Sequence, residues 1–392
     1  MLLSFALLFL CGLALGDLCK KIKFPALFGF MLTGIILGPY CLNWIDASIL
    51  DASSALRKIA LIIILLRAGL NLDIDALKKV GRPAILMCFL PATFEILGFA
   101  CLGPVILHLS LLDSLIMGSV LAAVSPAVVV PNMLKLIDEK YGVREGIPQL
   151  IMAGASVDDV FVIVLFSAFT SLASSGSFQA ISFLRIPTSI LSGIGVGVVL
   201  GLLLHVFFKK VDMRNTVKVI TLLCISFLLV TVEDACTGWF GFSGLLAIMA
   251  MSAVIHFQDP AISKTISASY SELWICAEVL LFALVGAAVD IHYALASGVS
   301  AILIILGALV FRMMGVYCCV TKTQLDKKER LFCMLAYTPK ATVQAAIGSI
   351  PMAMGLACGK VVLTVAVCSI LLTAPLGAFV INATYQKLLK KD

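Results

Sequence analysis

Two adjacent carboxylates, Asp158 and Asp159, lie in the middle of a long apolar stretch of the chain. Neighbouring side chains on a helix point about 100° apart, so one carboxylate can face a cavity while the other meets a neighbouring helix. A carboxylate that titrates near physiological pH can hold a proton or a cation, but it does not hold both well. This competition is the chemistry of cation–proton exchange, and hard oxygen ligands suit Na⁺ or Li⁺. The alternative interpretation is a purely structural buried network.

Three more charged residues fall inside apolar stretches, where an ionised side chain is costly and usually functional. They are Glu95, Arg312 and Lys340. We expect Glu95 and Arg312 to pair between helices, in a structural or a mechanistic role. Lys340 follows a proline and could neutralise the ends of an interrupted helix or pair with Asp158. The neutral side chains that could complete a cation site are Ser125, Ser156 and Thr342.

The elements that must position these residues are membrane-spanning helices. Of the 392 residues, 61% are apolar and only 13% are charged, about half the charged share of a soluble domain. A helix needs about 20 apolar residues to cross a bilayer, and no long polar stretch separates a soluble domain. The sequence predicts one all-α membrane domain over residues 1–392, with thirteen spans at about 2–19, 24–41, 56–72, 83–109, 113–135, 149–173, 187–208, 217–233, 240–257, 270–290, 297–320, 329–350 and 361–384. The first stretch could be a cleaved signal peptide, but its basic residues follow it, which favours a real span.

Basic residues are distributed unequally between the two ends of these spans. Of the 28 Lys and Arg residues, 21 follow odd-numbered spans or lie in the tail, and four lie on the opposite side. The positive-inside rule then predicts a multi-pass protein of the cell membrane with its N-terminus outside and its C-terminus in the cytoplasm. Topology thus accounts for the net charge of +6, and no nucleic-acid partner is expected.

Short motifs recur at nearly constant offsets of 212, 217 and 213 residues. The matching segments are 28–30 with 240–242, 69–73 with 286–290, and 125–130 with 338–343. Because the partners are seven spans apart, the two copies, about 24–173 and 240–384, should cross the membrane in opposite directions. Inverted repeats of this kind are typical of secondary transporters. Chance recurrence in an apolar chain is the alternative.

Prolines interrupt two of the predicted spans at matching places. Pro126 and Pro131 fall in one span and Pro339 falls in the other. A proline inside a helix removes a hydrogen bond and clashes with the preceding turn. In lipid, the freed backbone groups must find protein or a water-filled cavity. Two interrupted spans in two repeats therefore indicate a binding site near mid-membrane, although each proline alone could be an ordinary kink.

Four stretches carry a resemblance to a known family: residues 65–73, 125–131, 153–159 and 339–348. Through them the chain resembles the cation/proton antiporter superfamily, on its branch with paired aspartates. Within it, the chain is most similar to the NHA (solute carrier 9B) sodium/hydrogen exchanger-like proteins. The stretch Pro-Lys-Ala-Thr-Val-Gln-Ala-Ala from residue 339 is the most specific.

The resemblance implies the inverted-repeat fold of the bacterial antiporters NhaA and NapA, with two broken crossing helices. A six-helix core, here about 56–173 and 270–350, would move like an elevator against the dimerisation domain of a homodimer. Asp159 would be the main carrier of cation and proton, with Asp158 beside it, and Glu95 and Arg312 would be the family's ion pair. Electrogenic relatives have a lysine where this chain has Arg312. Arginine does not release its proton readily, so the stoichiometry is left open.

Other functions stay as alternatives at this point. Sodium-coupled symport of an organic anion on a related fold would need an anion site, and K⁺/H⁺ exchange would use the same carboxylates. A channel would show neither saturable nor proton-linked flux. An intramembrane aspartyl protease needs two aspartates on separate helices, so no enzyme activity is expected. The only ligands expected are the transported ions, without a cofactor.

Overall fold

The computed structural model describes residues 1–22, 24–71, 81–174, 180–211, 213–236 and 242–392, apart from the side chains of 156, 174, 180–187, 189, 190, 234, 236 and 291–297. Two repeat motifs, at 72–73 and 240–241, and the side chain of Ser156 thus lie outside the described residues. Within the described ranges the secondary structure is helical, apart from one isolated β-bridge between Tyr141 and Lys391. The all-α fold is confirmed.

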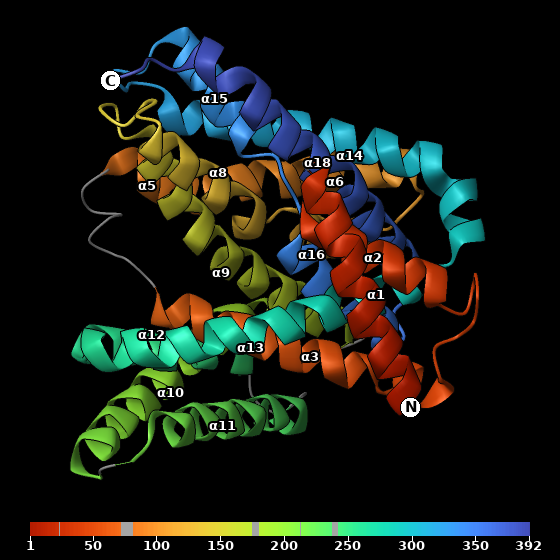
Figure 1. Ribbon diagram of the computed structural model, residues 1–392, viewed down its shortest axis with the longest axis vertical. Helices are drawn as coiled ribbons and strands as arrows, with labels where there is room; N and C mark the ends of the chain where they lie inside the picture. The colour runs from red at the N-terminus through yellow and green to blue at the C-terminus, as the bar shows by residue number, and fades with distance from the viewer. Residues whose placement is uncertain (23, 72–80, 175–179, 212, 237–241) are drawn as a thin grey trace. The chain divides into compact units, whose positions relative to one another are not determined.

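The helices have the following bounds: α1 (Leu2–Lys21), α2 (Ala26–Leu37), α3 (Ala47–Leu70), α5 (Arg82–Met87), α6 (Leu90–Ile106), α7 (Leu111–Leu121), α8 (Pro126–Asp138), α9 (Ile147–Ser174), α10 (Ala180–Lys210), α11 (Asn215–Cys236), α12 (Gly244–Gln258), α13 (Pro260–Ala287), α14 (Ile291–Val320), α15 (Lys327–Ala336), α16 (Thr342–Ile347), α17 (Ile350–Ala353) and α18 (Gly359–Leu388). Figure 1 follows them from the N-terminus to the C-terminus.

Among the described residues, nine helical stretches are long and apolar enough to cross a bilayer, and α2 and α12 are shorter apolar helices. Each predicted span overlaps a helix of the structure. The count of thirteen is not itself confirmed, because neither α3 nor the divided stretch from α15 to α17 is among these helical stretches. A multi-spanning membrane protein is confirmed.

The chain divides into two compact units. The first comprises Met1–Ser54, Asp73–Val162 and Val279–Asp392, and the second comprises Ala55–Leu72 and Ile163–Glu278. The continuous helices α3, α9 and α13 contribute to both units. All of the charged residues singled out in the sequence lie in the first unit.

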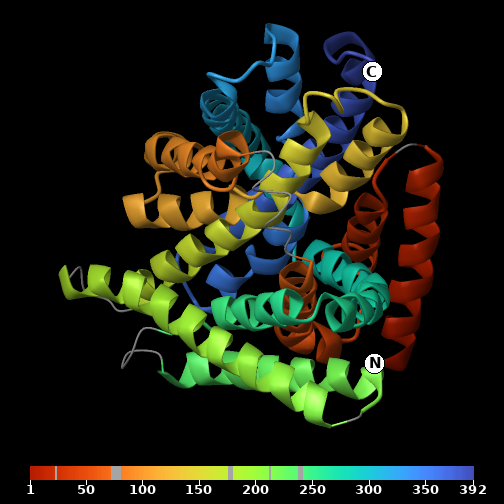
Figure 2. The same ribbon diagram turned by 90° about the vertical axis from the view of Figure 1, so that its left-hand side faces the viewer.

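Small residues allow helices to approach closely in both units. In the first, α1 and α2 lie side by side (Figures 1 and 2), and a Cβ atom on Gly34 of α2 would overlap the carbonyl of Ala283 in α13. In the second, α10 packs along α12, and Gly193, Gly197 and Gly201 of α10 face the α12 backbone. In lipid the hydrophobic effect does not drive helices together, and glycines four residues apart instead allow the two backbones to pack closely.

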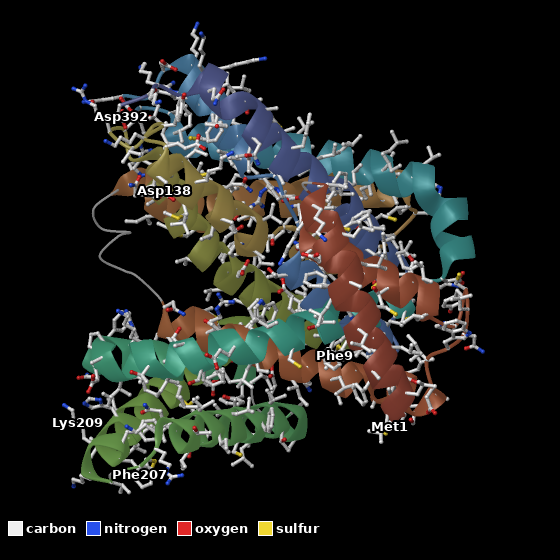
Figure 3. The ribbon with its side chains drawn as sticks, viewed as in Figure 1. Met1, Phe9, Asp138, Phe207, Lys209 and Asp392 are labelled. Atoms are coloured by element: carbon white, nitrogen blue, oxygen red, sulfur yellow. The ribbon has the colours of Figure 1, made fainter. Side chains whose placement is uncertain are left out.

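The C-terminal residues form hydrogen bonds and an ion pair with the loop after α8 and with the residue before α15. Lys390 O accepts a hydrogen bond from Gly142 N, and the Lys390 ammonium lies 3.1 Å from Asp326 Oδ2. Asp392 Oδ2 accepts from the backbone of Val143, just after α8. Figure 3 shows Asp392 near Asp138, the last residue of α8. The loop after α8 and the start of α15 are therefore held to the same terminal segment.

A buried apolar cluster surrounds the region in which the interrupted helices meet. It draws on α5, α8, α9, α14, α15 and α18, and on Tyr337, which follows α15. Its fully buried members include Met87, Val129, Ile151, Val316, Tyr337 and Ile381. Polar groups inside such a cluster must find partners from the protein itself.

Candidate functional site

The two aspartates of α9 are buried but have different surroundings. Asp158 is fully buried, and its Oδ2 accepts hydrogen bonds from Val124 N at 2.9 Å and from Arg312 Nη2 at 2.8 Å. Asp159 is 9% exposed, and its Oδ1 has no hydrogen-bond partner among the described residues. The pair therefore consists of one carboxylate whose Oδ2 is held by the protein and one whose Oδ1 has no described partner.

Arg312 of α14 is the centre of the polar network. Its Nη1 lies 2.9 Å from Glu95 Oε2 and also donates to the carbonyl of Ala122. Its Nε donates to Tyr337 O at 2.6 Å, and its guanidinium lies 4.9 Å from the centre of the Tyr337 ring. Only a planar fork of five N–H donors can reach this set of acceptors at once.

Lys340 completes the network from the break between α15 and α16. Its Nζ lies 2.6 Å from Glu95 Oε2, and its backbone N–H donates to Thr373 Oγ1 of α18. The sequence suggested Asp158 or the helix ends as its partner, and the structure pairs it with Glu95 instead. Glu95 is thus shared between two cations, Lys340 and Arg312, while Arg312 is shared between two carboxylates, Glu95 and Asp158.

This arrangement has a simple charge balance. Lys340, Glu95, Arg312 and Asp158 are each at most 1% exposed and, in their ordinary ionised forms, sum to zero net charge. Asp159 adds one negative charge in the same apolar region. An unpaired buried charge is very costly, so the carboxylate of Asp159 needs a compensating positive charge or a proton.

The two interrupted helices meet at their breaks. The first break comprises residues 122–125 between α7 and α8, and the second comprises residues 337–341 between α15 and α16. Ser125 N donates to Pro339 O across them at 2.8 Å. Pro126 is the first residue of α8, where a missing N–H costs nothing, Pro131 lies inside α8, and Pro339 lies in the second break.

Several buried oxygens around the breaks have no hydrogen-bond partner among the described residues. They are Ser125 Oγ, Asp158 Oδ1, Asp159 Oδ1, Thr342 Oγ1 and Gln344 Oε1. A buried polar atom without a partner is destabilising, so each of these oxygens needs an explanation such as a functional role. Oxygen donors of this kind suit hard cations. The described residues hold no cluster of three His, Cys, Asp or Glu side chains that would suit a transition metal.

A protein-family model described as a transmembrane sodium/hydrogen exchanger matches residues 5–387. The chain belongs to this sodium/hydrogen exchanger family. Sodium/hydrogen exchanger 9B2 of Homo sapiens is 33% identical over 406 residues, covering 100% of this chain and 75% of the relative. Sodium/hydrogen exchanger 9B1 of Homo sapiens is 35% identical, covering 86% and 67% respectively.

A solved structure supports the fold of this exchanger. The sodium proton antiporter MjNhaP1 from Methanocaldococcus jannaschii at pH 8 superposes with a TM-score of 0.83, covering 98% of this chain and 97% of the other. The sequence identity is 21%, so this likeness concerns the fold. It confirms the expected likeness to an antiporter fold, and the family confirms the resemblance drawn from the motifs.

Two contributors to the site of this exchanger were missed in the sequence. Gln344 is buried at the crossing, and the backbone N–H of Val124 is a ligand of Asp158. An amide side chain close to a proline in an apolar span was an available signal for Gln344. No sequence signal identifies a single backbone N–H group, because its role depends on which carboxylate packs against it.

Proposed function

We propose that this chain exchanges Na⁺ or Li⁺ for H⁺ across a membrane, with Asp159 as the group that carries both ions. The observation that carries this proposal is the charge balance at the crossing. Asp159 lies beside four charged groups whose charges cancel, and it has no cationic partner of its own among the described residues. Bound Na⁺ or a bound proton neutralises it equally, so each displaces the other.

The ligands of the cation in this proposal are oxygens near the breaks. Asp159 and the free Oδ1 of Asp158 supply charge, and the hydroxyls of Ser125 and Thr342 supply neutral oxygens. Ser156 is a further candidate, one turn before Asp159 on α9. These hard donors fit Na⁺ or Li⁺, and the transported ions need no cofactor.

The same proposal assigns a supporting role to the Lys340–Glu95–Arg312–Asp158 network. Its ion pairs link α6, α14, α9 and the second break. A bundle that changes access to a bound ion must keep the ligand geometry constant, and a shared ion-pair network provides that rigidity. We further propose a homodimer, alternating access by motion of the bundle, and an N-terminus outside the cell with the C-terminus in the cytoplasm.

Sodium-coupled symport of an organic anion is less favoured by the charges. An anion site needs an available cation, but Arg312 and Lys340, the buried cations of the crossing, both pair with carboxylates. K⁺/H⁺ exchange would depend on the same competition between a cation and a proton for Asp159, and it differs only in the size of the cation. An enzyme would need a reactive group positioned against a substrate. We propose instead that this chain transports ions without covalent chemistry.

Proteoliposomes that contain the full chain and a lumenal pH dye test the proposal. Adding Na⁺ outside should drive proton efflux from wild-type vesicles and not from Asp159→Asn vesicles, because the amide cannot hold a proton or balance a cation. Asp138→Asn is the matched control, since Asp138 is exposed at the end of α8. Undiminished exchange by Asp159→Asn would contradict the assigned carrier.

A further inference from the structure

The break between α7 and α8 is held on one side by a single amide side chain. Gln344 Nε2, from α16, donates to Leu121 O at 3.2 Å and to Ala123 O at 2.9 Å. Gln344 is only 1% exposed. The carbonyl of Leu121 ends α7 and that of Ala123 lies in the break, where helical partners are missing. This side chain thus satisfies backbone groups that the break leaves free.

The same short segment contacts the charged network with its other backbone groups. Ala122 O accepts from Arg312, and Val124 N donates to Asp158 Oδ2 at 2.9 Å. The Val124 N–H belongs to the same peptide unit as the carbonyl that accepts from Gln344 at 2.9 Å. A rotation of that rigid peptide unit would change both hydrogen bonds together.

The orientation of the Gln344 amide follows from its partners. Two carbonyl oxygens can only accept hydrogen bonds, so the NH₂ group must face them and Oε1 must point elsewhere. Oε1 is buried and has no partner among the described residues. The amide therefore holds the break through its NH₂ group alone, and its second polar atom is left without a described partner beside the break.

We propose that Gln344 is a positioning residue of the cation site, which acts through the peptide unit between Ala123 and Val124. By holding that unit, Gln344 keeps the Val124 N–H directed at Asp158 and leaves Asp158 Oδ1 directed at the transported ion. The residue therefore sets the affinity and the size preference for the cation. This inference rests on the proposed exchange function.

The first variant removes the whole amide. Gln344→Leu in the full chain, reconstituted in proteoliposomes, should raise the apparent KM for Na⁺ by roughly tenfold and change the ratio of the Li⁺ and Na⁺ KM values, with a smaller effect on kcat. Gln149→Leu is the matched control, because Gln149 lies in the first turn of α9, nine residues before Asp158. It should leave the KM for Na⁺ and the ratio unchanged.

The second variant keeps the shape and removes the donors. The carboxyl group introduced by Gln344→Glu can donate to a carbonyl only when it is protonated. The ratio of the variant's Na⁺ KM to that of wild type should therefore fall as the pH is lowered, a profile that a merely structural residue would not produce. This variant also decides the question if Gln344→Leu does not fold.

Two readouts separate failure of this inference from failure of the proposed function. The dye reports flux. The second readout is the Tm of the detergent-solubilised protein, because bound Na⁺ raises the Tm and the Na⁺ concentration needed for this rise reports binding without transport. Wild type without sodium-driven flux contradicts the proposed function. Gln344 variants with a wild-type KM, ion ratio and Na⁺-dependent Tm shift, or with only a lower Tm, overturn the positioning role.

Discussion

Asp158 and Asp159 are neighbours in α9, yet only Asp158 is paired. Asp158 accepts from Arg312 and from the backbone of Val124, whereas the buried Oδ1 of Asp159 accepts from no described group. One helical residue of separation places the first carboxylate against the ion-pair network and leaves the Oδ1 of the second without a described partner. The two aspartates should therefore respond differently to the same substitution.

Asp158→Asn should destabilise the protein far more than Asp159→Asn. Removing Asp158 leaves Arg312 and Lys340 to share the single carboxylate of Glu95, and breaking a buried pair in this way costs about 3 to 5 kcal/mol. Asp159→Asn removes an unpaired charge and should leave the stability unchanged or raised. Apparent Tm values in detergent without Na⁺ measure the difference, and equal losses for the two variants would contradict the assignment.

Arg312→Lys should lower both stability and exchange, even though the positive charge is kept. A single ammonium cannot reach Glu95, Asp158 and Tyr337 O in the geometry of the guanidinium. Leaving a buried acceptor without its donor costs roughly 1 to 3 kcal/mol. The apparent Tm and the sodium-driven flux check this, with the exposed Arg144→Lys as control. A variant as stable and active as wild type would show that charge alone matters.

The contribution of Asp326 to stability should disappear at acidic pH. The backbone N–H of Glu329 and the Lys390 ammonium hold the pKa of Asp326 below its usual value. A carboxyl with a lowered folded-state pKa stabilises above its unfolded pKa, about 3.9, and this is lost as the pH falls through the folded value. Asp326→Ala, which also removes the N-cap of α15, should thus lower the Tm at pH 7, by an amount that shrinks below about pH 4. A Tm difference that does not depend on pH would contradict the ionic part of this contribution.

Among the described cysteines, Cys41 should be the one that an external, membrane-impermeant maleimide labels. It is exposed in the connection between α2 and α3, which the positive-inside rule places outside. The exposed Cys101, Cys224 and Cys276 lie within apolar helices, where lipid excludes the reagent. In a Cys41→Ser background, Lys328→Cys should react only after the membrane is opened. External labelling of Lys328→Cys in sealed vesicles would reverse the proposed orientation.

The sequence by itself determined the class of protein, the interrupted spans and the paired aspartates. Lipid allows few charges and few prolines inside a span, so Asp158, Pro126 and Pro339 stand out from an apolar background without knowledge of any contact. The family resemblance followed from the same exceptional residues. These are local properties, and they need no information about which helices are neighbours.

The partners of the buried polar groups depend on the tertiary structure. Lys340 meets Glu95, 245 residues away, and Gln344 meets the carbonyl of Ala123, 221 residues away. Several buried partners were available to Lys340, and the choice among them depends on helix packing and on the path of the backbone through two breaks. The sequence shows which charges and backbone groups inside the membrane must find a hydrogen-bond or ion-pair partner. Which group becomes the partner is set by distances that exist only in the folded chain.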